Sequence, residues 1–118
     1  MKKTQFIPRG VFYSVERYIY RTQDGKRYWE FSYLETEHGF EVDIHQWPSY
    51  EGRGEGSIVA HWLPSPREGV ERQICFSAGK NAQTIEEAQQ FSMTYADLSS
   101  EYVDTGISID ALIAIRDN

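Results

Sequence analysis

Ser32, His45 and Asp43 are the three residue types of a nucleophilic catalytic centre, and they lie close together in the first half of the chain. Such a centre needs a hydroxyl beside a base, and an acid that orients the base. The same residue types also make polar surfaces that recognise other molecules. The strands that carry them decide whether they meet, and what surrounds them.

His45 and His61 suggest a second chemistry, metal binding. They begin two similar segments, 45–49 (HQWPS) and 61–65 (HWLPS), on either side of a glycine-rich stretch. If these segments pair, the two imidazoles and the Asp43 carboxylate form a ligand set suited to zinc or iron. The spacing matches no familiar metal motif, so we expect no metal and no cofactor.

The glycine-rich stretch 52–57 (GRGEGS) resembles a phosphate-binding loop only in composition. Phosphate loops lead into a helix N-terminus, where backbone amides meet the anion. This stretch leads into a predicted strand, contains Glu55 and directly follows Glu51, so it predicts a hairpin connection.

The elements that must position these residues begin with three aromatic-rich strands, at residues 11–22, 26–36 and 39–47. Asp24-Gly25 predicts a type I′ turn, which places Tyr20 opposite Trp29 and Tyr18 opposite Phe31. A second turn at His38-Gly39 is expected to place Tyr33 opposite Ile44 and Glu35 opposite Val42.

Because side chains alternate along a strand, this register divides the three strands into two faces. The apolar face predicts the core, made of Tyr18, Tyr20, Trp29, Phe31, Tyr33, Val42 and Ile44. The opposite face carries the candidate binding residues Arg17, Glu30, Ser32, Asp43 and His45, with Tyr13, Tyr28 and Trp47 around them. The middle of a sheet face lacks the strained turn and the backbone amides of a hydrolase, so this face favours recognition over catalysis.

The second half of the chain predicts two further strands, at 57–63 and 71–77, and then two helices. Thr84 and Glu87 form a capping box before a helix that runs to about residue 103, and Ser108 caps a short second helix. The predicted fold class is α+β. An antiparallel sheet of about five strands, an N-terminal three-stranded meander plus a second hairpin, precedes one long and one short C-terminal helix packed on one face. We expect residues 1–118 to form a single domain.

Composition indicates a soluble, cytoplasmic chain. No segment has the roughly 20 apolar residues that span a bilayer. The basic N-terminus runs directly into Pro8-Arg9-Gly10, which is no export signal, and Cys75 is the one cysteine. The net charge is −6, and residues 81–118 hold one Lys or Arg against seven Asp and Glu. This charge disfavours nucleic acid and anionic membranes, and favours a partner with a basic surface.

These observations favour a small acidic binding or regulatory protein that acts through protein–protein interaction, and they favour a binding protein over an enzyme. Acidic α+β chains of this size are frequent among bacterial and phage inhibitor and accessory proteins. The alternative is a ligand-binding or enzymatic domain with a pocket between helix and sheet that uses tyrosines and His45 or His61. A closed core between helix and sheet would favour the protein–protein interaction hypothesis. A cavity on the order of several hundred Å³, the size of known ligand sites, with a histidine in its wall would favour the ligand-binding hypothesis. The identity of the partner and the oligomeric state stay open.

Overall fold

The computed structural model describes residues 4–7, 11–14, 16–76 and 81–116, and for the first two ranges it describes the backbone alone. In the order of the chain, the elements of this described part are β1 Thr4–Ile7, β2 Val11–Ser14, β3 Tyr18–Arg21, β4 Tyr28–Thr36, β5 Gly39–Gln46, α1 Ser57–Ala60, β6 Trp62–Pro64, β7 Arg72–Ile74, α2 Ile85–Thr105 and α3 Ile109–Arg116.

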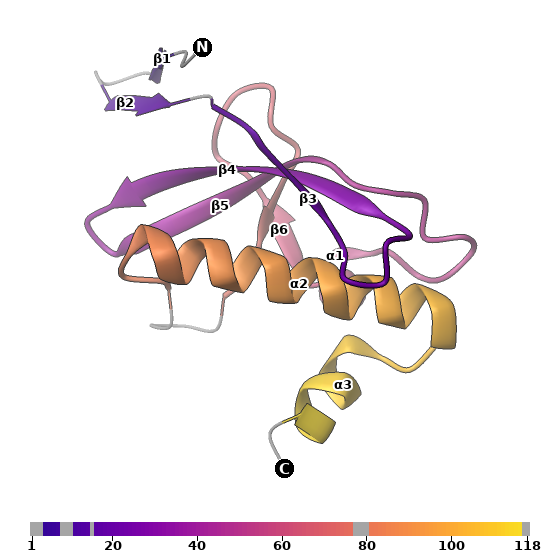
Figure 1. Ribbon diagram of the computed structural model, residues 1–118. Coiled ribbons are helices and arrows are strands. Elements are labelled where there is room, and N and C mark those ends of the chain that lie inside the picture. The colour runs from indigo at the N-terminus through magenta and orange to yellow at the C-terminus, as the bar shows by residue number, and fades with distance from the viewer. Residues whose placement is uncertain (1–3, 8–10, 15, 77–80, 117–118) are drawn as a thin grey trace.

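A five-stranded antiparallel sheet in the order β3-β4-β5-β7-β6 forms the centre of the described fold. The long helix α2 lies along one face of this sheet, and α3 follows it at the C-terminal end (Figure 1). The predicted α+β class, with strands followed by one long and one short helix, is confirmed. Among the described residues, no helix has the length and apolar character needed to cross a membrane.

The first hairpin has the predicted register, with Tyr20 opposite Trp29 and Tyr18 opposite Phe31. Its turn differs from the predicted type I′ turn. The Thr22 N–H donates to the Arg27 carbonyl at 2.9 Å, and Gly25 has a φ of 76° while Asp24 keeps a negative φ. A four-residue loop with one left-handed glycine therefore gives the same pairing.

The second hairpin is shifted from the predicted register. Tyr33 lies opposite Val42 and Glu35 opposite Phe40, because the turn consists of Glu37 and His38 and the ladder closes between Thr36 and Gly39. Gly39 has a φ of 107°, and a Cβ there would lie 2.7 Å from the Ala82 carbonyl oxygen. Each residue of β4 lies opposite a residue of β5 two positions away from the predicted one, so from Gly39 to Ile44 the side chains keep their predicted faces.

Two predicted strands are wrong in extent. Residues 11–22 do not form one strand, since β2 pairs with β1 in a separate two-stranded sheet and only β3 joins the main sheet. The segment 57–63 begins with the single turn α1, in which the Ala60 N–H donates to the Gly56 carbonyl, and becomes a strand only at Trp62. The predicted second hairpin exists as β6 and β7, and residue 77 of its second strand lies outside the described residues.

The core lies between the sheet and α2. Four of the predicted core side chains, Trp29, Phe31, Val42 and Ile44, are at most 1% exposed. Tyr20 and Tyr33 are half-buried because their hydroxyls reach α2, where they bond with Asp97 and Ser92. Tyr18 is 43% exposed, so its assignment to the core is wrong, and its position on the edge strand β3 explains this.

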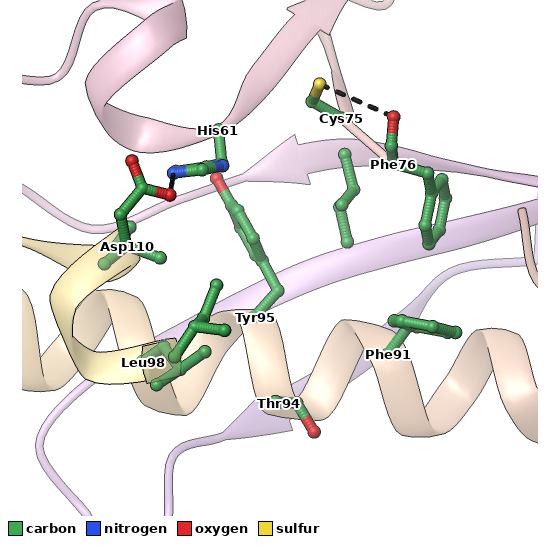
Figure 2. Close-up of a pocket in the computed structure, with 11 residues that line it drawn as sticks. His61, Cys75, Phe76, Phe91, Thr94, Tyr95, Leu98 and Asp110 are labelled. Carbon is green, nitrogen blue, oxygen red and sulfur yellow. Dashed lines mark hydrogen bonds and ion pairs between the residues drawn. The ribbon is translucent and has the colours of Figure 1, made fainter. Parts of the chain in front are cut away.

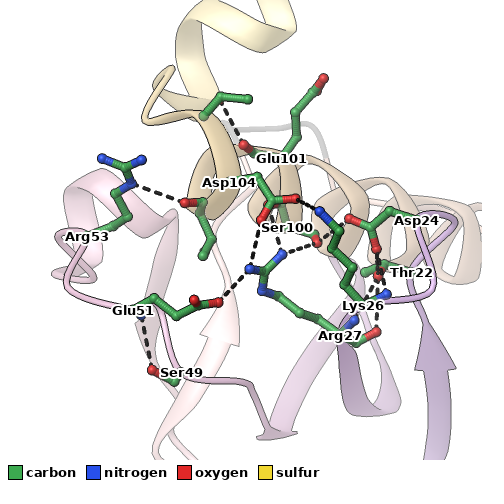
Figure 3. A network of polar contacts seen from close by, with 12 residues as sticks. Thr22, Asp24, Lys26, Arg27, Ser49, Glu51, Arg53, Ser100, Glu101 and Asp104 are labelled. Atoms are coloured by element: carbon green, nitrogen blue, oxygen red, sulfur yellow. Dashed lines mark hydrogen bonds and ion pairs between the residues drawn. The ribbon is translucent and has the colours of Figure 1, made fainter.

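Caps and a buried arginine fix α2 against the sheet. The Thr84 hydroxyl accepts from the Glu87 N–H as predicted, and Gly106 ends the helix in a left-handed conformation. Figure 3 shows the Arg27 guanidinium at the other end of the helix, donating to Ser100 and Asp104 of α2. These contacts hold the first hairpin onto the C-terminal half of α2.

Candidate functional site

The outer face of the sheet, opposite α2, brings the predicted serine and histidine together. Ser32 Oγ and His45 Nε2 share a hydrogen bond of 2.7 Å, and beside them Arg17 forms an ion pair of 3.1 Å with Glu30. In the observed register Ser32 lies opposite Asp43, and His45 reaches Ser32 from a diagonal position two residues along β5. The serine and base of the predicted cluster therefore meet.

Asp43 does not complete a triad, because it is bound to Arg67. The Arg67 Nε donates to Oδ2 at 2.6 Å and Nη2 donates to Oδ1 at 2.9 Å, while the Ser65 hydroxyl donates to Oδ1 at 2.9 Å. The Asp43 and Arg67 side chains are 2% and 6% exposed. Arg67 comes from the loop between β6 and β7, which the sequence marks only as a connection. Together with Ser32 and His45, Asp43 and Arg67 form what we call the outer polar cluster.

The outer polar cluster is too buried for a substrate to reach its serine. Burial lowers the pKa of His45, and the nearby Arg17 lowers it further, so the imidazole is neutral near pH 7 and could act as a base. The Ser32 side chain that it contacts is only 1% exposed. A substrate cannot reach this hydroxyl without opening the sheet surface.

Trp47 lies on the opposite face from the one predicted. In the pairing of β4 with β5, Glu30 lies opposite Gln46 and Phe31 opposite Ile44, so β5 contains one additional residue at His45. Such a bulge reverses the alternation beyond it. Trp47 consequently packs against the core, where it stacks on Arg72 with 3.9 Å between the guanidinium carbon and the ring centre.

Two candidates remain, Tyr28 and Tyr13, and the structure describes the side chain of Tyr28 alone. Tyr28 is 51% exposed at the start of β4. Tyr13 lies in β2, whose side chains are outside the described residues, so its binding role stays a prediction.

A separate pocket opens on the other side of the sheet, and the sequence indicates it only through His61. It has a volume of about 540 Å³. Figure 2 shows it between α2, the end of β7 and α3, with His61 at the corner between α1 and β6. Its lining residues are His61, Ile74, Cys75, Phe76, Phe91, Thr94, Tyr95, Leu98, Ile109, Asp110 and Ile113.

The polar end of the pocket is an imidazole–carboxylate pair. His61 Nε2 lies 3.0 Å from Asp110 Oδ1 of α3, and the two side chains are 27% and 78% exposed. His61 has left-handed backbone angles, φ 58° and ψ 47°, and its N–H donates to the Ser57 carbonyl. Its own carbonyl accepts from the Cys75 N–H at 3.0 Å. The backbone thus holds the imidazole at the pocket, whereas its carboxylate partner is largely exposed to solvent.

The walls of the pocket are apolar and aromatic. Phe76 and Phe91 meet edge to face, with ring centres 5.2 Å apart. Phe91 is 45% exposed and Ile113 is 39% exposed, so part of the wall is open to water. The Tyr95 hydroxyl donates to the Ala60 carbonyl at 2.9 Å, which leaves its ring as apolar lining.

The sequence pattern gave no signal for most of this pocket. Phe91, Tyr95 and Leu98 recur at helical spacing, a pattern that indicates an apolar helix face and not a pocket. α3 carries more apolar residues than are needed to cover one buried face, and Ile113 directly follows the buried Leu112. This excess of apolar residues is the one sequence feature that indicates an apolar surface beyond the core. Asp110 and Cys75 come from distant elements, which no local pattern connects.

The two histidine segments do not pair with each other. β7 lies between β5 and β6 in the sheet, so His45 and His61 are not on neighbouring strands. Within the described ranges, no group of three His, Cys, Asp or Glu side chains has an arrangement that could hold a metal ion.

Comparison with family models, with curated proteins and with solved structures finds no match to this chain. The function therefore has to be argued from the geometry of the two regions.

Proposed function

We propose that this protein binds a small, mostly apolar molecule in the pocket between α2, α3 and the end of β7. The observation that carries the proposal is the cavity of about 540 Å³ with a histidine at one end. Known ligand sites have volumes of roughly 300–1,000 Å³, apolar walls and a small number of polar groups that orient the ligand. The lining of this pocket has the same character.

The exposed part of the pocket wall supports a bound molecule. The pocket is open to solvent, so part of its apolar lining is in contact with water. Phe91 and Ile113 leave about two fifths of their surfaces in water, at 45% and 39% exposure. A ligand would cover this apolar surface and gain the free energy of removing it from water.

The polar groups of the pocket favour binding over catalysis. The Tyr95 hydroxyl is used by the Ala60 carbonyl, and the His61 imidazole by Asp110. The Cys75 thiol lies 3.8 Å from the Phe76 carbonyl oxygen, at the limit of a weak hydrogen bond. Catalysis by a cysteine requires a base that activates the thiol, and the imidazole here is directed to α3.

A pair of tryptophan substitutions on α2 tests the proposal. Thr94 lines the pocket, whereas Gln90, one turn earlier, is exposed and does not line it. Both substitutions break the long 3.4 Å contact between these two side chains, so that loss is matched. The probe is N-phenyl-1-naphthylamine, an uncharged molecule whose fluorescence rises in apolar surroundings.

We expect saturable binding of the probe by the wild type and by Gln90→Trp, and a loss of at least about tenfold in affinity for Thr94→Trp, because a filled pocket excludes the ligand. Equal binding by a folded Thr94→Trp variant would overturn the proposal.

A second candidate function is the binding of another protein at the β3 edge of the sheet. Ile19 is 68% exposed there, and Tyr28 on the neighbouring strand is 51% exposed. Edge strands offer unpaired backbone groups, and exposed aromatic residues favour protein contacts. Arg17 and Glu30 of the predicted binding residues adjoin this patch.

This second candidate is tested by capture from a cell lysate with mass spectrometry of what is bound. Ile19→Ser with Tyr28→Ser should abolish capture of a specific partner. Ile58→Ser, at a residue that is 88% exposed on α1, is the matched control. A partner captured equally by all three proteins would remove the β3 edge as its binding site.

A further inference from the structure

We infer that the ligand of the pocket is a small hydrophobic amine, whose ammonium group pairs with Asp110 and whose apolar part lies against the aromatic wall. This inference rests on the proposed function, because it names the class of molecule that the same pocket takes.

The charge inside the pocket points to a cation. Asp110 is the one carboxylate among the described residues that line the pocket, and none of those residues is a lysine or an arginine. Its Oδ1 is 3.0 Å from His61 Nε2, and Oδ2 has no partner among the described residues. An ammonium group can therefore bind this carboxylate while the contact with His61 stays intact.

An anionic ligand would need hydrogen-bond donors, and most of the donors in the pocket are already bonded to other groups of the protein. The Tyr95 hydroxyl donates to the Ala60 carbonyl, and the His61 Nε2–H faces Asp110. Apart from His61 and the weak thiol of Cys75, the described lining residues offer one other side-chain donor, the hydroxyl of Thr94. A carboxylate or phosphate would meet the charge of Asp110 with little compensation.

The aromatic wall of the pocket also favours a cationic ligand. Ring faces carry negative potential, so they attract ammonium groups and repel anions. Phe91 and Phe76 line the pocket beside Tyr95, and Phe91 is 45% exposed. An amine with an aryl or alkyl body matches both parts of the lining.

The surrounding field also favours a cation. α2 and α3 belong to residues 81–118, which hold one Lys or Arg against seven Asp and Glu. An excess of one sign around a cleft raises the local concentration of ligands with the opposite charge. The pocket is therefore negative both at its polar end and in its setting.

Three probes that differ only in the head group test the inference: 4-phenylbutylamine, 4-phenylbutan-1-ol and 4-phenylbutyrate. Their affinities are measured by calorimetry at low salt and again at high salt. We expect the amine to bind about fivefold more tightly than the alcohol, which is the size of a partly exposed ion pair, and the acid to bind most weakly. The preference for the amine should shrink at high salt.

Asp110→Asn keeps the shape of the side chain and removes the charge. It should lower the affinity for the amine to that for the alcohol and leave the alcohol unchanged. Glu101→Gln is the matched control, because it removes one charge from the same acidic segment at a residue that does not line the pocket.

The outcomes separate the inference from the proposed function. If the alcohol or the acid binds as tightly as the amine, or if Asp110→Asn binds the amine as the wild type does, the amine assignment is overturned while the pocket function stands. If none of the three binds and Thr94→Trp leaves N-phenyl-1-naphthylamine binding unchanged, both are overturned.

Discussion

The outer polar cluster and the pocket lie on opposite sides of one sheet, and they differ in how their groups are satisfied. In the cluster, Asp43 and Arg67 are buried and bonded to each other, and Ser32 is bonded to His45. In the pocket, Phe91 and Ile113 are part-exposed apolar groups with open space beside them.

The difference shows that a cluster of side chains of catalytic types can serve to stabilise the fold. Buried charged groups must be paired, because removing an unpaired charge from water costs on the order of several kcal/mol of folding free energy. When a buried polar group is bonded to partners within the protein, it is no longer available to bind a substrate. Apolar surface left in water, in contrast, is relieved by a ligand, so the pocket is the region with capacity to bind.

The largest expected effect that separates the two regions is on stability, for Arg67→Met. This change leaves the Asp43 carboxylate buried without its cation, and we expect the free energy of unfolding to fall by about 3–5 kcal/mol. Urea denaturation measures it. Adding Asp43→Asn should recover part of the loss, and probe binding per folded molecule should stay unchanged. A loss below about 1 kcal/mol would show that the cluster is not structural.

Two neighbouring residues of α3 give the next largest effect. Leu112 is 5% exposed and Ile113 is 39% exposed and lines the pocket. Leu112→Ala should cost about 2–3 kcal/mol of unfolding free energy because it leaves a cavity in the core. Ile113→Ala should cost less than about 1 kcal/mol but weaken N-phenyl-1-naphthylamine binding severalfold. Equal costs with unchanged binding would place Ile113 in the core.

Ser32→Ala should have a smaller effect. It removes the hydroxyl of the 2.7 Å hydrogen bond to His45, which is half-buried and can still reach water. We expect a loss of about 1 kcal/mol of unfolding free energy and no change in probe binding. Abolished probe binding in the folded variant would connect the two regions and contradict the comparison.

The smallest effect is the pH dependence of the cluster. Burial, and then the charge of Arg17, lowers the pKa of His45 below its ordinary value of 6.5. Below pH 6.5 the unfolded chain therefore binds a proton that the folded chain does not, and the free energy of unfolding falls as the pH falls. His45→Asn should show a shallower decline between about pH 6.5 and 5 in urea denaturation. A decline as steep as in the wild type would assign the effect to other groups.

The core side of the sheet could be predicted because strand alternation and turn chemistry are local. The Asp24-Gly25 turn fixed the first register although its backbone differs from type I′. The error in the second register moved each pair by two positions, which preserved the predicted faces of β5 as far as Ile44. The cap at Thr84 likewise depends on residues three apart, and it is confirmed.

The rest of the site could not be predicted because it depends on contacts distant in sequence. The additional residue at His45 turns Trp47 to the core, and an alternating pattern carries no mark of such a bulge. Arg67 reaches Asp43 from a loop, and the pocket joins His61 to Asp110 across 49 positions of sequence, as their residue numbers show. These contacts depend on how α3 and the loops pack against the sheet, and residues far apart in the sequence decide that packing.

The most direct test of the central claim is an amide NMR titration with 4-phenylbutylamine, followed by 4-phenylbutan-1-ol as a head-group control. The account predicts saturable shift changes at Phe91, Thr94 and Ile113, with Ser32 and Asp43 unchanged. Changes centred on Ser32 and Asp43, or none at all with either probe, would contradict it.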